Sequence, residues 1–548
     1  RMKESTDILF EPPNKRPCSE FDSPNMNVVK AGKEMPIPNS LDVKVQIFND
    51  PVHGFIEVHP LLVEIIHTPQ FERLKDIKQL GVCYWVFPGA SHNRFEHCLG
   101  TAHLCGKLID TLHNLHRNEI EITEKESLCV KVAGLCHDLG HGPFSHFFDG
   151  FYIPRAKPGC NWHHEQASCD LFELLIDSNP SVAKKLKEFG LGREEIDFIK
   201  DLIKGKDPQT DKVERICPIT GKPKWFLFEI VSNKRTGIDC DKFDYFARDC
   251  ANVGVTSNFD YRRYFQNVRI LPIDHQLQIC VREKEVFNLY ELFHTRWSLH
   301  HRVYQHKTQA PIQDLLLEAF LKVDKTLRIS EAITDMKRYT VLTDSVMYDI
   351  LRNDSKDPNI IEAQELLQRI QRRELYKFCG QTQPGSENGC SSESEIAHDL
   401  ASISEKLASI LKRDFKVLTP EQIFVSIVNI HFGMQRNDPV DAVVFYNKSY
   451  QPLRVRKEQV SQILPQKFHE KYVRVYAKSR EDSDTIQLCF EAWCRQHGYP
   501  VPHMLQGDRS GYFSPAFKQN QSAINGVPSH DQVLPKGPRS LQKDFENC

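Results

Sequence analysis

The chain has 548 residues, a formal net charge of -2 at pH 7 and a pI near 7.0. That length allows two or three domains with a substantial buried core, and the near-neutral charge excludes binding of nucleic acid by bulk positive charge. The 17 cysteines form no CxxC pair, no signal peptide opens the sequence, and no apolar run reaches the roughly 18–20 residues of a membrane span. These features predict reduced thiols in the cytosol or nucleus and no membrane partner.

The N-terminal part of the sequence divides into a leader and a helical region. Residues 1–40 are polar and rich in proline, which predicts a disordered leader. They contain the basic element NKRPC (14–18), which indicates a nuclear import signal or, alternatively, a solvated Lys-Arg pair. On the first interpretation the protein is nuclear, with the cytoplasm as a second compartment. Over residues 41–380 apolar residues recur at three- and four-residue spacing, which predicts a helical core.

The second half of the sequence changes in composition. Within the core, residues 205–224 interrupt the periodicity and predict a surface loop or short hairpin. Residues 381–395 have the composition of a linker. Residues 396–498 combine β-branched segments with a terminal helix, so the expected fold is mainly α with a smaller α+β C-terminal lobe. Residues 499–548 predict a flexible tail, in which Ser514, followed by proline, fits a proline-directed kinase site or a chance occurrence.

Four residues form a set suited to binding a transition metal: His97, the adjacent pair His137 and Asp138, and Asp241. Two imidazoles and two carboxylates are a mixed nitrogen and oxygen ligand set, which suits Zn, Fe, Mn or Ni better than Mg or Ca. The four residues lie in three segments with helical periodicity. The sequence therefore predicts a metal held inside a helical bundle, with hydrolysis of a phosphate ester as the expected chemistry.

The first two of these segments place their polar residues at useful positions. Residues 91–109 predict a helix with Arg94 and His97 on one face, because the two are three positions apart. Residues 127–149 begin as a nearly all-apolar helix and break at glycines, which sets the His-Asp pair at the rim of a cavity. A histidine on an apolar helix is more often a satisfied core residue, but the adjacent acid and the nearby histidines favour a ligand.

The third segment, residues 237–250, carries further polar groups on one helical face. Asp241, Tyr245 and Asp249 recur every four residues, and Lys242 precedes Tyr245 by three. A metal ligand and substrate contacts can therefore share this face. The alternative is a salt-bridged, exposed helix, and the aromatic residues of the segment disfavour it.

Phosphate chemistry needs a cation, charge complementarity and a proton donor. A bound divalent metal lowers the pKa of its water and neutralises phosphoryl oxygens. Arg94 and Lys242 offer further cationic contacts to a polyphosphate. His146 or His164 can protonate the leaving oxygen, because each has a carboxylate nearby in the sequence. These carboxylates are Asp149 and Glu165.

The motif HDLGHGPFSH, flanked by GASHNRFEH and IDCDKFDYFARD, carries a family resemblance. From about Val45 to Trp493 the chain resembles the metazoan SAM- and HD-domain-containing deoxynucleoside triphosphate triphosphohydrolases. The resemblance implies an HD-domain helical bundle that cuts a deoxynucleoside triphosphate (dNTP) into deoxynucleoside and intact triphosphate. The SAM domain of that family is missing from this sequence, which we expect to reflect an alternative isoform or an ancestral loss.

The resemblance also implies roles for individual residues. The metal ligands would be His97, His137, Asp138 and Asp241. The catalytic histidine would be His164, with His141, His146, Asp149 and Arg94 completing the catalytic group. The substrate contacts would be Gln79, Leu80, Arg94, Lys242, Tyr245, Asp249, Tyr304 and Gln305. An aromatic ring packed against the sugar edge would leave no room for a 2′-hydroxyl and so exclude ribonucleotides.

By resemblance, the enzyme is also a homotetramer activated by GTP and dNTPs, with Mg accompanying the nucleotides. At the guanine-nucleotide site Arg373 fits the family, but Gln46, His67, Glu72 and Lys75 depart from it. His67 stands where a carboxylate reads guanine, and Glu72 is positioned to replace that carboxylate, so we expect weakened or altered activator selectivity. The remaining candidates for activator contacts are Val86, Phe87, Arg263, Arg282, Lys284, Asn288, His306, Lys307 and Lys448.

Family resemblance further implies that the protein limits the cellular dNTP pool and restricts viruses as part of innate immunity. Two alternatives remain open. One is an HD-type phosphohydrolase that acts on another nucleotide. The other is a nucleic-acid-binding scaffold with a vestigial metal site. The basic segments at 14–16 and 453–457 favour it, and its expected partner is single-stranded nucleic acid. Both alternatives differ from the first interpretation in the products formed from a dNTP.

Overall fold

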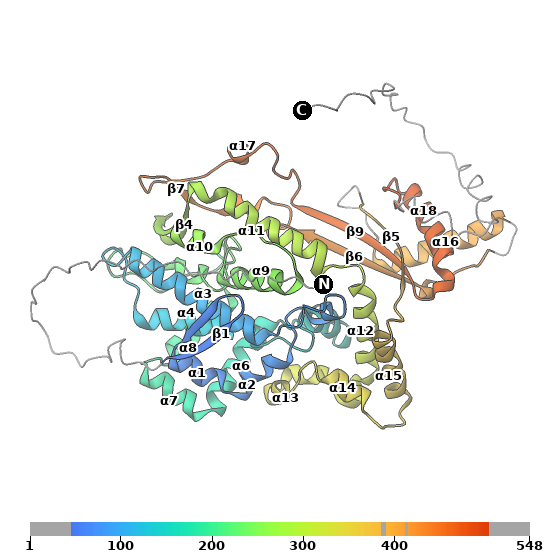
Figure 1. Cartoon of the computed structure of the whole chain (residues 1–548), viewed down its shortest axis with the longest axis horizontal. Helices are drawn as coiled ribbons and strands as arrows, with labels where there is room; N and C mark the ends of the chain where they lie inside the picture. Colours follow the sequence, from blue (N-terminus) through green and yellow to red (C-terminus); the bar gives the residue numbers. More distant parts are fainter. Residues whose placement is uncertain (1–44, 385–390, 412–414, 503–548) are drawn as a thin grey trace, which may run out of the picture. The chain divides into compact units, whose positions relative to one another are not determined.

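The computed structural model describes residues 45–384, 391–411 and 415–502 (Figure 1). The predicted leader with its import signal, part of the predicted linker and Ser514 lie outside these residues. Helices dominate the described residues, so the prediction of a mainly α fold is confirmed. None of the described helices combines the length and the apolar character needed to cross a membrane.

The helical part of the chain packs around one continuous hydrophobic core. Helix α3 contacts both α4 and α9, and these three helices carry the predicted metal ligands at or next to their ends. The helices of this part are α1 (Pro60–Ile66), α2 (Pro69–Glu72), α3 (Arg94–Leu115), α4 (Glu124–Cys136), α5 (Ile153–Ala156), α6 (His164–Ser178), α7 (Pro180–Glu188), α8 (Arg193–Lys204), α9 (Cys240–Val253), α10 (Tyr261–Gln266), α11 (Val286–Leu299), α12 (Gln309–Leu327), α13 (Met336–Thr340), α14 (Val346–Leu351) and α15 (Pro358–Gln371).

Capping residues set where the three ligand-bearing helices begin. Asn93 caps α3 in a capping box with Glu96, whose carboxylate accepts a hydrogen bond from the Asn93 backbone N–H. Thr123 and Glu126 form the same arrangement at the start of α4. Asp239 caps α9 through its carboxylate. Each cap satisfies backbone donors that the first turn leaves unpaired, so the helix starts are fixed locally by the sequence.

Three sheets lie among the described residues. Strands β1 and β2 form an antiparallel hairpin, and the second sheet has the order β3-β4-β7-β8 with β4 and β7 parallel. The third sheet has the order β5-β9-β6 and is antiparallel throughout. The strands are β1 (Gln46–Asp50), β2 (Gly54–Val58), β3 (Val268–Ile273), β4 (Gln276–Arg282), β5 (Lys377–Thr382), β6 (Ile423–His431), β7 (Phe445–Tyr446), β8 (Pro452–Leu453) and β9 (His469–Ala477).

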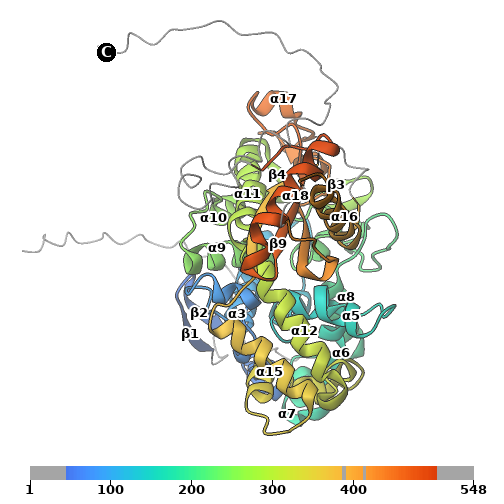
Figure 2. The same ribbon diagram turned by 90° about the vertical axis from the view of Figure 1, so that its right-hand side faces the viewer.

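The third sheet and two helices form the expected smaller α+β lobe. Helix α16 (Glu393–Leu411) packs against α18 (Ser483–Gln496), and Figure 2 looks onto this pair. Together with the sheet they enclose a second hydrophobic core, which includes Val473 and Trp493. Strand β5 begins before the predicted linker 381–395 and ends inside it, and it pairs with β9, so the lobe includes a strand from that earlier part of the chain. The short helix α17 (Lys457–Val460) lies between β8 and β9.

The C-terminal lobe holds the segment that follows α11. The Arg474 guanidinium donates to the backbone carbonyl of Gln305, and the Tyr476 hydroxyl donates to the carbonyl of Lys307 at 2.8 Å. Both donors lie on β9. Because Gln305 and Lys307 belong to the predicted substrate and activator sets, strand β9 positions residues of both sets.

Candidate metal centre and active site

Three of the predicted metal ligands, His97, His137 and Asp138, offer ligand atoms that all lie within 4.8 Å of one another, and Asp241 lies beside the two imidazoles. The Nε2 atom of His97 lies 3.2 Å from Nε2 of His137, 3.1 Å from Oδ1 of Asp241 and 3.4 Å from Oδ2 of Asp138. The Nε2 atom of His137 lies 3.3 Å from Oδ1 of Asp241 and 3.5 Å from Oδ1 of Asp138. The fold thus gathers donors from α3, from the end of α4 and from the first turn of α9.

These separations fit a shared metal ion. Donor atoms bound about 2.1 Å from one ion lie roughly 3.0–3.4 Å from each other, and the distances of 3.1–3.5 Å between the imidazole nitrogens and the carboxylate oxygens are close to that spacing. Two imidazole nitrogens 3.2 Å apart both present lone pairs when neutral, so they repel unless a positive charge lies between them. The residues present therefore fit a transition metal with nitrogen and oxygen ligands.

His97 is held from behind by a buried carboxylate. Its Nδ1 lies 2.7 Å from Oδ2 of Asp244, which is fully buried. The same carboxylate receives His53 at 2.7 Å and two bonds of 2.9 Å from the Arg248 guanidinium. Asp244 occupies Nδ1 of His97 and so directs Nε2 toward the metal position. Gly100 allows this approach, since a Cβ there would lie 1.8 Å from the Asp244 carboxylate.

The second imidazole is oriented by the backbone. His137 follows α4, and its Nδ1 donates to the carbonyl of Gly134 at 2.9 Å, which leaves Nε2 facing the other ligands. Burial disfavours charge on this ring, but the carboxylates of Asp138 and Asp241 outweigh burial and raise the pKa of His137. For His97, burial is likewise outweighed by hydrogen bonds to three carboxylates, which raise its pKa well above the ordinary value.

Arg94 contacts both a predicted metal ligand and the loop that carries Gln79. Its guanidinium pairs with the Asp138 carboxylate, and its Nε donates to the Ser145 hydroxyl at 2.9 Å. A third, longer contact of 3.4 Å reaches the carbonyl of Gln79. Burial raises the pKa of Asp138, but Arg94 and the neighbouring histidines hold it well below the ordinary value. Asp138 is therefore ionised at neutral pH, as a metal ligand needs to be, and Arg94 is an oriented, buried side chain.

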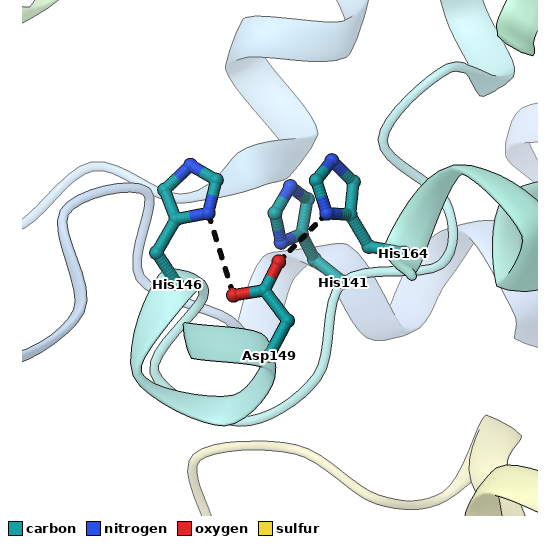
Figure 3. A group of neighbouring side chains, drawn as sticks. All are labelled: His141, His146, Asp149 and His164. Atoms are coloured by element: carbon teal, nitrogen blue, oxygen red, sulfur yellow. Dashed lines mark hydrogen bonds and ion pairs between the residues drawn. The ribbon is translucent and has the colours of Figure 1, made fainter. Parts of the chain in front are cut away.

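Next to the metal ligands, four side chains form a second polar cluster (Figure 3). Asp149 is its centre, with one carboxylate oxygen 2.7 Å from Nδ1 of His164 and the other 3.4 Å from Nδ1 of His146. The His141 ring stacks on His164 with centroids 3.9 Å apart. Glu165, the sequence neighbour of His164, lies farther away at 3.7 Å. The structure thus places Asp149 beside both candidate acids.

The cluster is polarised toward a protonated His164. Burial disfavours charge on His164, but its hydrogen bond to Asp149 and the nearby Glu165 and Asp138 carboxylates outweigh burial and raise its pKa. Burial also lowers the pKa of the His141 ring beside it, and the positive charges of Arg94 and His164 lower it further. Asp149 is held ionised by the two histidines it contacts. The arrangement therefore keeps one proton on His164, where an acid catalyst needs it.

Two of the predicted substrate contacts, Tyr304 and Asp249, are linked by a hydrogen bond. The Tyr304 hydroxyl donates to one oxygen of Asp249, and Nε2 of His92 lies 2.7 Å from the other. Tyr304 ends a π-helical turn, His300–Tyr304, after α11, and Asp249 lies on α9. Such turns often occur at functional sites because they re-aim a side chain. Asp249 thereby fixes the position of the Tyr304 ring.

The other predicted substrate contacts have mixed surroundings. Tyr245 packs edge-on against His97 with ring centroids 6.3 Å apart. Lys242 pairs with Asp239 at 3.1 Å, so its ammonium group has a partner within the chain. The Oε1 atom of Gln79 is buried and has no hydrogen-bond partner among the described residues. A buried amide without a partner is a ready acceptor for a ligand. Leu80 follows Gln79 in the same loop.

Some of the predicted activator residues contact one another, and others contact residues outside the predicted set. Phe87 lies edge-on to His306 with centroids 5.7 Å apart, and Val86 precedes Phe87. Arg263 pairs with Glu285 at 2.8 Å. Asn288 also contacts Glu285, Arg373 contacts the carbonyl of Trp85, and Glu72 pairs with Lys75. The remaining members are Arg282 on β4, Lys284 in the short helix Glu283–Glu285, Lys307 next to His306, Lys448 after β7, His67 at the end of α1 and Gln46 on β1.

Comparison with known proteins decides the family. A family model described as "HD domain" matches residues 94–214. The human protein named deoxynucleoside triphosphate triphosphohydrolase SAMHD1 is 47% identical over 84% of this chain and 75% of its own length. The mouse protein of that name is 46% identical over 84% and 72%, and a Dictyostelium discoideum homologue is 35% identical over 82% and 81%. The chain belongs to this family.

The match to the HD domain has an informative boundary. It begins at Arg94, the first residue of α3, and ends before α9. Asp241 therefore lies outside it, and so does Tyr304. The matched residues thus include His97, His137 and Asp138, whereas Asp241 lies on a helix beyond the match.

Several functional neighbours were missed by reasoning from the sequence. Four of them contact a predicted site residue directly through a hydrogen bond, two contact the Asp244 carboxylate, and one accepts backbone N–H groups of the neighbouring loops. Asp244 and Asp249 lie five positions apart on α9, and only the structure shows that Asp244 is the one that contacts His97. The missed residues are His53, His92, Asp239, Asp244, Ser145, Arg248 and Asp344.

Proposed function

We propose that this protein hydrolyses deoxynucleoside triphosphates to deoxynucleoside and inorganic triphosphate. The observation that carries the proposal is the juxtaposition of the four metal ligands with the cluster built on Asp149. A metal centre beside a half-buried imidazole with a raised pKa suits the cleavage of a phosphate ester at an alkoxide leaving group. The triphosphohydrolase names of the relatives support the same reaction.

The chain's own residues orient the substrate and supply the proton. A metal bound at the four ligands would neutralise charge on the phosphoryl oxygens and lower the pKa of a bound water. Arg94, fixed by Asp138 and Ser145, is preoriented as a cation for the phosphate chain. His164 holds its proton toward the leaving 5′-oxygen of the deoxyribose and is steadied by Asp149.

Discrimination against ribonucleotides follows from the sugar contacts. With Asp249 bonded to both Tyr304 and His92, the Tyr304 ring has little freedom to retreat. A ring held at the sugar edge excludes a 2′-hydroxyl by geometry and gives that hydroxyl no acceptor. Gln79 offers its buried amide oxygen as a hydrogen-bond acceptor for the bound nucleotide.

Product analysis tests the reaction directly. Purified protein is incubated with each dNTP, an activating nucleotide and Mn or Fe, and the products are separated by ion-exchange chromatography. Equal amounts of deoxynucleoside and inorganic triphosphate are expected. Pyrophosphate with a deoxynucleoside monophosphate, or no product with any dNTP, would refute the proposal.

The pH dependence of hydrolysis should report on His164. Replacing Asp149→Asn removes the carboxylate that favours the imidazolium, so the pKa of His164 falls toward its ordinary value. The alkaline limb of kcat/KM then moves to lower pH, and activity at neutral pH drops by about 10- to 100-fold. The exposed Asp177→Asn on α6 is the control, with an unchanged profile. An unshifted alkaline limb in Asp149→Asn would remove His164 from the role of acid.

We further propose control by assembly, as in the family that the chain resembles. Nucleotide phosphates would neutralise Arg and Lys side chains that face one another between subunits, so activators should raise the tetramer fraction. The Glu72 carboxylate pairs with the exposed Lys75 at 2.5 Å. Breaking an exposed ion pair costs little free energy, so Glu72 is available to accept hydrogen bonds from guanine. Sedimentation with GTP, dGTP and dATP tests this, and we expect GTP to be less strictly required than in the family. No change in assembly with any nucleotide would contradict it.

The cellular role is likewise a proposal. A dNTP triphosphohydrolase in the nucleus would lower the dNTP pool and thereby restrict viruses that copy DNA. The import signal and Ser514 on which nuclear residence and modification depend lie outside the described residues. Imaging of the tagged full chain, compared with a Lys15→Ala and Arg16→Ala variant, tests the localisation.

A further inference from the structure

The catalytic loop after α4 is braced by a segment about 200 positions later in the chain. This segment, residues 336–345, comprises α13 and the turn that follows it, and we call it the strap. The Tyr339 hydroxyl donates to the carbonyl of Gly140 at 2.8 Å. Buried Arg73 joins the two segments, because its guanidinium donates to the carbonyls of His141 at 2.9 Å and Leu342 at 2.6 Å.

Near the end of the strap, the carboxylate of Asp344 accepts hydrogen bonds from two loops. One oxygen of Asp344 accepts the backbone N–H of Phe144 at 2.6 Å, and the other accepts the backbone N–H of Lys78 at 2.9 Å. Lys78 immediately precedes Gln79 and Leu80, the predicted substrate contacts. Phe144 lies two positions before His146. A single side chain therefore joins the loop that meets substrate to the loop that carries an acid-base histidine.

The turn that Asp344 binds is strained. Phe144 and Ser145 have φ angles of 59° and 56°, in the left-handed region that non-glycine residues seldom adopt. Residues in this region are strained and persist only when their surroundings hold them. Besides Asp344, Ser145 is held by donating to the carbonyl of Lys78 at 2.6 Å and by accepting from Arg94 at 2.9 Å.

We propose that Asp344 is a positioning residue, which clamps the strained turn Phe144–Ser145 against the Lys78 loop and so places His146 relative to Asp149 and the substrate. This inference rests on the proposed function, because His146 matters only if phosphate-ester cleavage occurs here. The clamp acts through backbone amides, so neither its partners nor its role depends on the side chains of Lys78 and Phe144. Burial raises the pKa of Asp344 to about 7, and protonation would remove one of its two acceptors.

The test compares Asp344→Asn with Asp349→Asn, an exposed carboxylate five positions later on α14. Hydrogen exchange measured by mass spectrometry should show faster exchange over residues 76–82 and 142–148 in Asp344→Asn only. The kcat per metal-loaded, folded chain should fall by about 10- to 100-fold, because misplacement by an ångström suffices for that loss. Metal content and KM should stay close to wild type. Asp349→Asn should match wild type in all four measurements.

A second pair of variants keeps the test decisive if Asp344→Asn folds poorly. Ser145→Ala removes another restraint on the same turn, so its effect on kcat should be non-additive with that of Asp344→Asn. Unchanged exchange in both loops, unchanged kcat, or strictly additive effects would overturn the proposal. The pH profile separates positioning from mere destabilisation, because only a displaced His146 alters the profile of the remaining activity. Hydrogen exchange and metal content are measured without substrate. They therefore test whether Asp344 holds the two loops even if the wild-type protein releases no triphosphate.

Discussion

Replacing His137→Ala together with Asp138→Ala is expected to abolish dNTP hydrolysis, with a loss of at least about a thousandfold. The two side chains supply half of the donors that converge at the metal position, and the remaining His97 and Asp241 come from different helices. Two ligands hold a divalent metal far more weakly than four, so bound transition metal should be lost as well. Metal content by mass spectrometry and dNTP turnover are the two measurements.

A matched variant separates this effect from general damage. His113 and Asp110 are exposed on α3, and alanine at both removes the same two residue types without touching the site. That variant should keep its metal and its turnover. The fold of the site variant should largely survive, because Arg94 retains its bonds to Ser145 and to the carbonyl of Gln79. Near-normal turnover in His137→Ala with Asp138→Ala would show that the metal assignment is wrong.

The second large effect is expected from Asp244→Asn. The Asp244 carboxylate is fully buried and accepts bonds from His97, His53 and Arg248. An asparagine of the same shape loses the charge that pairs with buried Arg248, and its amide nitrogen opposes another donor. Breaking such a buried pair costs about 3–5 kcal/mol of stability. Loss of the bond to Nδ1 of His97 should also weaken metal affinity about 10- to 100-fold.

Two measurements distinguish these consequences. Urea denaturation gives the free energy of unfolding, and competition with a chelator gives the metal affinity. Asp110→Asn on α3 is the control, because its exposed ion pair with Lys131 on α4 should contribute within about 1 kcal/mol. If Asp244→Asn unfolds like wild type and binds metal equally well, the buried carboxylate does not orient His97.

Local features of this molecule follow from the order of its residues. The capping residues Asn93, Thr123 and Asp239 start three helices where the apolar periodicity begins. The four candidate metal ligands could be predicted because imidazoles and carboxylates are rare inside apolar helices, and because both kinds of group bind transition metals. Helical spacing also placed Arg94 near His97, because a side chain three positions away shares a face.

Spacing along one helix cannot tell which distant group a face will meet. Glu165 adjoins His164 in the sequence, yet Asp149 is its closer partner because the loop after α4 folds back over α6. Asp244 and Asp344 gain their roles from contacts 147 and 200 positions away. The amino-acid sequence by itself determined the helices and the chemical identity of the ligands, since these depend on neighbours. Only the tertiary structure decided which carboxylate supports which histidine, because burial and long-range hydrogen bonds exist only once the helices have packed.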